Sequence, residues 1–152
     1  MIDLLKTIAE NSKCQRRKVA AILCDENDNV ISTGYNAVLG HTCCKRKYCT
    51  SGENLELCNS IHAEMLACVN RNIEGKTLYV NTFPCPICSK YLIAGHIKKI
   101  YYYEEYANYQ ESAALLLEHG IELYKMSKDG SSEQITNVAL CGISTSKHKF
   151  FD

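Results

Sequence analysis

One histidine and two cysteines limit what this chain can form more than any other residues. A His-x-Glu motif stands at His62 and Glu64, and a Cys-x-x-Cys motif at Cys85 and Cys88 follows directly after Pro84. One imidazole and two thiolates supply three of the four ligands that tetrahedral zinc prefers, which leaves one position open for water. A water on zinc loses its proton near neutral pH and becomes a nucleophile. The pattern therefore predicts a catalytic zinc ion bound by His62, Cys85 and Cys88.

The order of these residues matches H-x-E…P-C-x-x-C, the signature of zinc-dependent nucleobase deaminases. In that chemistry, protons must reach the base under attack and the departing ammonia. Glu64, two residues from the predicted ligand His62, is placed to carry them without touching the metal. Each motif alone has another interpretation. A single His-x-Glu is usually packing plus a solvated carboxylate, and a single Cys-x-x-Cys can be redox-active or half of a zinc knuckle.

The residues around the cysteines fit a metal site. Thr77-Leu78-Tyr79-Val80 has the pattern of a buried strand, and 89–94 that of a helix ending at Gly95. Cys85 and Cys88 then lie at a strand-to-helix turn. Because the N-terminus of a helix is positively polarised, we expect this turn to favour thiolates.

Length and charge restrict the class of protein. The chain has 152 residues, a formal net charge of zero and ten cysteines. Its length suits one domain with a single core, and its charge counts against a broad nucleic-acid footprint. It has neither a signal-peptide pattern nor an apolar run long enough for a membrane span. Cysteines without a secretory signal indicate metal binding and buried thiols, so we expect a cytoplasmic protein without a membrane partner.

Apolar periodicity predicts alternating helices and strands. The expected helices are 2–11, 61–72, 89–94 and 112–119, and the expected strands are 19–24, 30–36, 77–81, 97–103 and 121–124. Residues 37–58 have no clear period and are predicted to form a loop. We expect a three-layer α/β/α sandwich on a five-stranded mixed sheet, with a zinc-dependent deaminase domain at 1–126 and a loosely packed tail at 127–152.

Further motifs narrow the assignment. Residues 12–19, 32–36 and 51–58, together with both zinc motifs, resemble the cytidine and deoxycytidylate deaminase superfamily, and within it the deoxycytidylate (dCMP) deaminases. The resemblance covers about residues 8–125. It implies a cytidine-deaminase-like fold and hydrolysis of dCMP to dUMP and ammonia. In that reaction zinc-bound hydroxide attacks C4 of cytosine, and Glu64 carries protons.

The resemblance also implies residues that bind a small-molecule nucleotide. Asn36 matches an asparagine that bonds the sugar near its 3′ hydroxyl, and Tyr106 matches a tyrosine close to the nucleotide. Arg16 and Arg17 look like part of the monophosphate site, since a guanidinium fork suits phosphate. Ala63 completes the predicted substrate-binding set. Asn36 could equally cap a turn, and a short basic cluster is usually a solvated surface.

A second, structural zinc is predicted in the long loop. Cys14, Cys44, Cys49 and Cys58 lie in or beside this loop, and four thiolates around zinc would hold it in place. Related dCMP deaminases carry a structural zinc in this region, which supports the prediction. Cys43 is an alternative to Cys44. The competing interpretation is that some of these cysteines are small buried hydrophobic residues.

Other functions remain open from the sequence. The same chemistry can act on cytidine, a modified dCMP or adenosine in transfer RNA, and a zinc-stabilised binding module can keep the fold without catalysis. Glu64 argues against the binding module, because a purely structural site needs no proton carrier. We expect a homo-oligomer, a hexamer or a dimer, and no nucleic-acid partner.

Overall fold

The structure is a computed structural model and describes residues 1–40 and 54–138. Its helices are α1 (Ile2–Ala9), α2 (Ala63–Cys68), α3 (Pro86–Ala94) and α4 (Tyr109–Glu118), with a 3-10 turn at Leu55–Leu57. Its strands are β1 (Ala20–Cys24), β2 (Val30–Tyr35), β3 (Ala37–Val38), β4 (Ser60–Ile61), β5 (Thr77–Thr82), β6 (Lys99–Glu104), β7 (Glu122–Met126) and β8 (Ser132–Ile135). None of the helices in these two described segments is long and apolar enough to span a bilayer.

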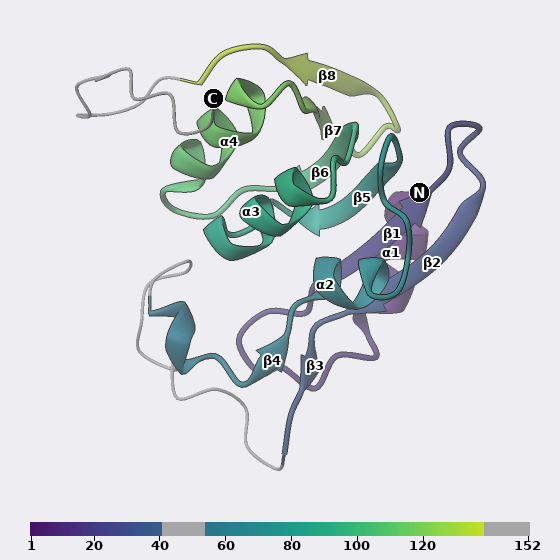
Figure 1. Ribbon diagram of the computed structural model, residues 1–152. Coiled ribbons are helices and arrows are strands. Elements are labelled where there is room, and N and C mark those ends of the chain that lie inside the picture. The colour runs from purple at the N-terminus through teal and green to yellow at the C-terminus, as the bar shows by residue number, and fades with distance from the viewer. Residues whose placement is uncertain (41–53, 139–152) are drawn as a thin grey trace.

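Six strands form one mixed sheet in the order β2-β1-β5-β6-β7-β8 (Figure 1). The strands β5, β6 and β7 are parallel, while β1 pairs antiparallel with both β2 and β5. Helices α3 and α4 are the crossovers that parallel neighbours require. The mixed sheet confirms the predicted fold class, but the prediction of five strands is wrong by one. The additional strand, β8, pairs antiparallel with β7 and comes from residues expected to form a tail.

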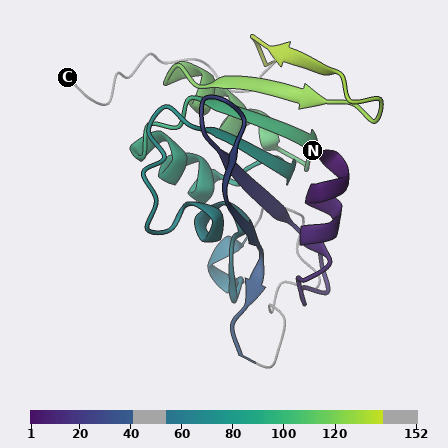
Figure 2. The same ribbon diagram turned by 90° about the vertical axis from the view of Figure 1, so that its right-hand side faces the viewer.

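The helices cover the sheet on both faces. Figure 2 shows α1 on one face and α2, α3 and α4 on the other. The larger apolar core fills the second side, between the sheet and these three helices. The smaller core lies under α1. Side chains along β6 alternate accordingly: Tyr102 is buried in the larger core, whereas Tyr101 and Tyr103 pack against the smaller one.

Helix α2 lies against β2 at Gly34, where the two backbones meet. A β-carbon on Gly34 would stand 2.5 Å from the amide nitrogen of Ala67 and closer still to the carbonyl oxygen of Ala63. The Ser32 hydroxyl, two residues earlier on the same strand, donates a hydrogen bond to the Ala67 carbonyl. A glycine inside a strand often marks such a close approach of another backbone. Gly34 therefore sets how closely α2 can approach the sheet.

Most elements begin or end within a few residues of their predicted bounds, and helix α2 and the predicted loop differ in ways that bear on the site. Helix α2 ends at Cys68, before the predicted end at residue 72. The backbone leaves the helical region at Val69, with ψ of 133°, and Asn70 follows in a left-handed conformation with φ of 57°. The predicted loop at 37–58 contains β3, which pairs with β4, and the 3-10 turn at Leu55–Leu57. The boundary predicted at residue 126 stays a prediction.

Replacing Gly34 by alanine tests the packing of α2. The added methyl group has only backbone atoms to displace, so we expect overpacking to lower the free energy of unfolding by about 1–3 kcal/mol. Chemical denaturation followed by circular dichroism measures this. Thr33→Ala, at an exposed position on the same strand, is the matched control and should cost less. A Gly34→Ala protein as stable as the native chain would contradict the close packing.

Candidate metal centre

The predicted ligands meet at one point between two helix N-termini. His62 is the residue before α2, Cys85 is the residue before α3, and Cys88 lies in the first turn of α3. The Nδ1 atom of His62 lies 3.3 Å from Sγ of Cys85 and 3.3 Å from Sγ of Cys88. Within the described residues, these three side chains form a group whose donor atoms lie close enough together to hold one metal ion.

The spacing of these donors suits zinc. Zn–N and Zn–S bonds of about 2.0 and 2.3 Å at a tetrahedral angle separate the ligand atoms by about 3.6 Å. The observed separation of 3.3 Å is within a few tenths of an ångström of that value. Three donors with nitrogen and sulfur atoms at this spacing leave a fourth position free, which is the arrangement of a catalytic site and not of a closed structural one. The donor set therefore fits the metal that the sequence predicts.

The charges of the three donors also favour a cation. A hydrogen bond from the Cys88 thiol, helped by His62, lowers the pKa of Cys85 to about 4. The bond to Cys85 raises the pKa of His62 to about 9, and the same thiolate together with burial raises the pKa of Cys88. The Cys85 thiolate thus disfavours a second negative charge on Cys88. A divalent cation would stabilise both thiolates.

Glu64 is the acidic residue closest to this centre in the sequence, and it is buried. It lies in the first turn of α2 and is only 4 % exposed. Burial, together with the negative charge of Cys85, raises the pKa of Glu64 to about 7. A carboxyl group with such a pKa exchanges a proton readily near neutral pH, as a general acid or base must.

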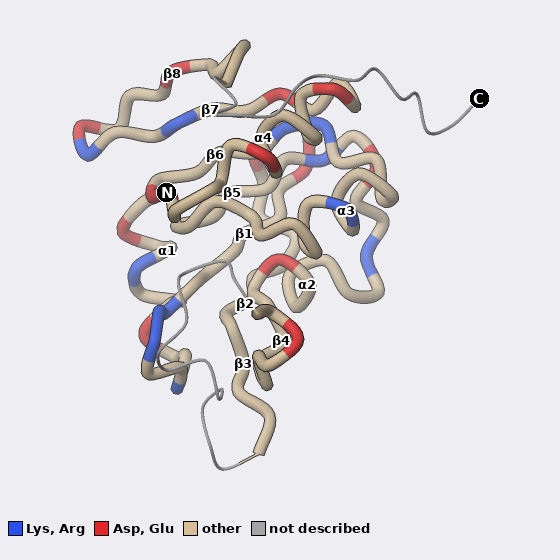
Figure 3. Tube along the Cα trace, turned by 90° about the vertical axis from the view of Figure 1, so that its left-hand side faces the viewer, with Lys and Arg blue, Asp and Glu red and all other residues tan. Residues whose placement is uncertain are grey.

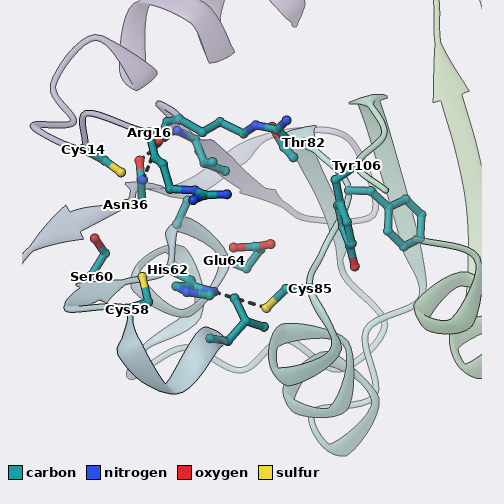
Figure 4. Close-up of a pocket in the computed structure, with 15 residues that line it drawn as sticks. Cys14, Arg16, Asn36, Cys58, Ser60, His62, Glu64, Thr82, Cys85 and Tyr106 are labelled. Carbon is teal, nitrogen blue, oxygen red and sulfur yellow. Dashed lines mark hydrogen bonds between the residues drawn. The ribbon is translucent and has the colours of Figure 1, made fainter. Parts of the chain in front are cut away.

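Above the donors lies a cavity of about 110 Å³. Figure 4 shows Glu64 in the middle of its wall, between His62 and Cys85 below and Asn36 and Arg16 above. All the predicted substrate residues line this cavity, namely Arg16, Arg17, Asn36, Ala63 and Tyr106. The structure therefore brings the predicted metal ligands, proton carrier and nucleotide contacts to one place.

Asn36 holds the basic segment beside the cavity. Its side-chain oxygen accepts a 2.8 Å hydrogen bond from the backbone N–H of Val19, and its amide donates to the carbonyl of Arg17 at 2.8 Å. The Asn36 side chain thus fixes the backbone that carries the arginines. Figure 3 shows this basic segment, in blue, just below α1.

Asn81, on β5, also bonds the backbone of this segment, and the sequence did not suggest this role. Its side-chain oxygen accepts from the backbone N–H of Ala20 at 2.9 Å, and its amide donates to the carbonyl of Lys18 at 2.9 Å. Two asparagine side chains therefore hold residues 17–20 by their backbone. We name this pair of residues, Asn36 and Asn81, the asparagine clamp. The available sequence signal was an asparagine near the end of a strand, which alone does not reveal its partner.

Tyr106 lines the cavity, and its hydroxyl bonds the turn that precedes α3. The hydroxyl donates to the carbonyl of Pro84 at 3.1 Å and lies 3.3 Å from the hydroxyl of Ser112. Since Pro84 directly precedes Cys85, this hydrogen bond holds the backbone next to a predicted metal ligand.

The second zinc site falls partly outside the described residues. Cys43, Cys44 and Cys49 lie there, so the four-cysteine site stays a prediction. Cys14 and Cys58 both line the main cavity. The thiol of Cys58 also interacts with the ring of His62, an interaction that the sequence does not suggest.

Removing one side of the asparagine clamp should loosen the basic segment. In Asn81→Ala, the buried N–H of Ala20 loses its acceptor, which typically costs about 1–3 kcal/mol. We expect faster amide hydrogen exchange at Ala20 and a lower free energy of unfolding. Asn27→Ala, at an exposed turn position, is the matched control and should change neither. Native exchange at Ala20 in Asn81→Ala would contradict the role of the clamp.

Comparison with known proteins gives the same assignment. The family model for the cytidine and deoxycytidylate deaminase zinc-binding region matches residues 1–104. The chain is 31% identical over 134 residues to the deoxycytidylate deaminase of Schizosaccharomyces pombe, covering 80% of this chain and 41% of that protein. It is also 31% identical over 118 residues to the deoxycytidylate deaminase of Mycobacterium phage D29, covering 68% of this chain and 91% of that one.

A solved structure shows the same fold. The dCMP deaminase of the cyanophage S-TIM5, in complex with dCMP and dUMP, superposes with a TM-score of 0.67 at 29% identity, covering 82% of this chain and 93% of that chain. The chain spans only 41% and 43% of the length of the fission-yeast and budding-yeast relatives. From its motifs, its candidate metal centre and these matches, the chain belongs to the cytidine and deoxycytidylate deaminase zinc-binding family.

Proposed function

We propose that this protein is a zinc-dependent hydrolase that converts dCMP to dUMP and ammonia. One observation carries the proposal: the buried Glu64 lies beside a three-donor metal centre, in a cavity that two arginines also line. A structural zinc site needs neither an open ligand position nor a buried acid next to it. The relatives named as deoxycytidylate deaminases support this choice of reaction.

In this proposal the metal centre supplies the nucleophile. His62, Cys85 and Cys88 would hold zinc, and bound zinc lowers the pKa of a water so that it can attack a carbon at neutral pH. The N-terminus of α3 stabilises the negative charge of the two thiolates, since Cys85 and Cys88 lie at that end of the helix.

Glu64 moves the protons. Deamination adds water and releases ammonia, so a proton must leave the water and protons must reach the ring and the departing amino group. Glu64 is buried and close to Cys85, where bulk water does not compete for these protons. Burial is the main cause that raises its pKa toward neutrality, and a carboxyl group raised in this way accepts and returns a proton readily.

The arginines select a nucleotide over a nucleoside. Arg16 and Arg17 are half-buried and line the same cavity as Glu64. A guanidinium can bond two phosphate oxygens at once, and such charge-assisted bonds are stronger than neutral ones. The asparagine clamp fixes the Arg17 backbone before substrate arrives, so less conformational entropy is lost on binding. The solved relative in complex with dCMP and dUMP supports a monophosphate as the substrate.

Ammonia release from a panel of cytosine and adenine nucleosides and nucleotides tests this proposal. We expect kcat/KM for dCMP to exceed that for deoxycytidine by roughly ten- to a hundredfold, the value of one charge-assisted hydrogen bond at about 1.5–3 kcal/mol. Replacing both Arg16 and Arg17 by alanine should remove most of this preference by weakening dCMP alone. Arg71→Ala, an exposed arginine outside the cavity lining, is the matched control. Equal kcat/KM for dCMP and deoxycytidine in the native protein would overturn the phosphate assignment. Ammonia release from adenine compounds in place of dCMP would overturn the assignment of dCMP as the substrate.

A further inference from the structure

We infer that Glu105 is a positioning residue: its carboxylate holds the loop after β6 so that the ring of Tyr106 forms a fixed wall beside the reacting base. This inference rests on the proposed function. Residues 105–108 connect β6 to α4. Tyr106, in this loop, is 8 % exposed and lines the cavity together with Glu64 and Cys85. The position of the loop therefore decides where one wall of the cavity stands.

The Glu105 carboxylate has three partners. Its Oε1 atom accepts a hydrogen bond from Nζ of Lys125 at 2.8 Å and another from the hydroxyl of Tyr102 at 3.3 Å. The side chain of Tyr109, the first residue of α4, interacts with the same carboxylate. Since these partners belong to β7, β6 and α4, one side chain ties the loop to three elements around it.

The two tyrosines of this network also pack against a second residue of the cavity wall. The ring of Phe83 meets the rings of Tyr102 and Tyr109 at steep angles, with centroid distances of 4.7 and 5.3 Å. Phe83 lines the cavity, and its backbone N–H donates to the carbonyl of Glu104 at 2.8 Å. Glu105 itself lies outside the described lining of the cavity. It therefore acts on the cavity through the aromatic residues that it holds.

The far end of the Tyr106 ring is fixed separately. Its hydroxyl donates to the carbonyl of Pro84 and lies 3.3 Å from the hydroxyl of Ser112. The backbone that carries the ring follows directly after Glu105, so the ring is held at both ends. Figure 4 shows the ring beside Glu64. Because a base undergoing deamination must reach Glu64 and the metal donors, the ring borders the space in which that base would react.

A second ion pair on the same sheet provides a comparison. The side chains of Lys125 and Glu105 are 42 % and 27 % exposed, and ion pairs that water reaches contribute little to stability. Lys76 pairs with Glu26 at 3.1 Å and is also partly exposed. Lys76 directly precedes β5, whereas the cavity lies beyond the other end of that strand. The two pairs are thus similar, but the pair of Glu105 is the one connected to a cavity wall.

Three variants separate positioning from a structural role. Glu105→Ala removes all three contacts, and Glu105→Gln keeps an oxygen that can accept from the tyrosine hydroxyls. We expect Glu105→Ala to lower kcat/KM by about ten- to a hundredfold on dCMP and deoxycytidine alike, because both carry the same base and small misplacements near reacting atoms have effects of this size. Glu105→Gln should recover most of this loss. Glu26→Ala is the matched control and should have native kcat/KM, and all three should have native zinc content.

A double-mutant cycle shows whether Glu105 acts through Tyr106. Tyr106→Leu keeps the apolar bulk of the side chain and removes its ring. In that background Glu105→Ala should cost little further activity, because residues that act as a unit are not additive. A loss as large as in the native background would mean that Glu105 acts independently of the ring, and would overturn the inference.

The remaining outcomes are distinct. Native kcat/KM in Glu105→Ala, with or without a lower melting temperature, would overturn the inference and leave the proposed function standing. A loss confined to dCMP would place the effect at the phosphate and overturn the inference as well. A native protein that releases no ammonia from any cytosine compound would overturn the proposed function first, and this inference with it.

Discussion

The close approach of α2 to β2 at Gly34 is the constraint on which the metal centre depends. Helix α2 has only six residues, so its position comes from the surface against which it packs and not from its own stability. Since His62 precedes α2 and Glu64 lies in its first turn, any shift of this helix moves both. Cys85 and Cys88 are placed independently, by β5 and α3. Gly34 allows α2 to pack closely against β2, and this packing brings His62 and Glu64 near the end of β5, where Cys85 and Cys88 follow.

Burial sets the electrostatics of the candidate site. A carboxyl group, two thiols and an imidazole lie together where little water reaches them, so each changes the pKa of its neighbours. The same burial makes every unsatisfied polar atom costly. The protein satisfies most of them internally, as the asparagine clamp does for the backbone of residues 17–20. The N-terminal basic segment and the end of β5 thereby become two walls of one cavity.

The sequence predicted best what is encoded locally. The predicted metal ligands and Glu64 follow from residue types at short spacings, and the hairpin and the strands follow from apolar runs. Strand β8 was missed because its residues are polar and exposed, and pairing with β7 is what makes them a strand. Asn81 was missed for a related reason. Asn81 acts on a backbone about sixty residues earlier, so only the fold reveals its role.

The most direct test of this account compares native protein with Glu64→Gln at equal zinc content. Glutamine keeps the size and polarity of the side chain but cannot carry a proton. We expect zinc to be retained, because Glu64 is not among the metal donors, and ammonia release from dCMP to fall by at least ~10²–10⁴-fold. A Glu64→Gln protein that binds zinc and turns over dCMP at the native rate would contradict the central claim that this buried carboxyl carries the protons of a deaminase.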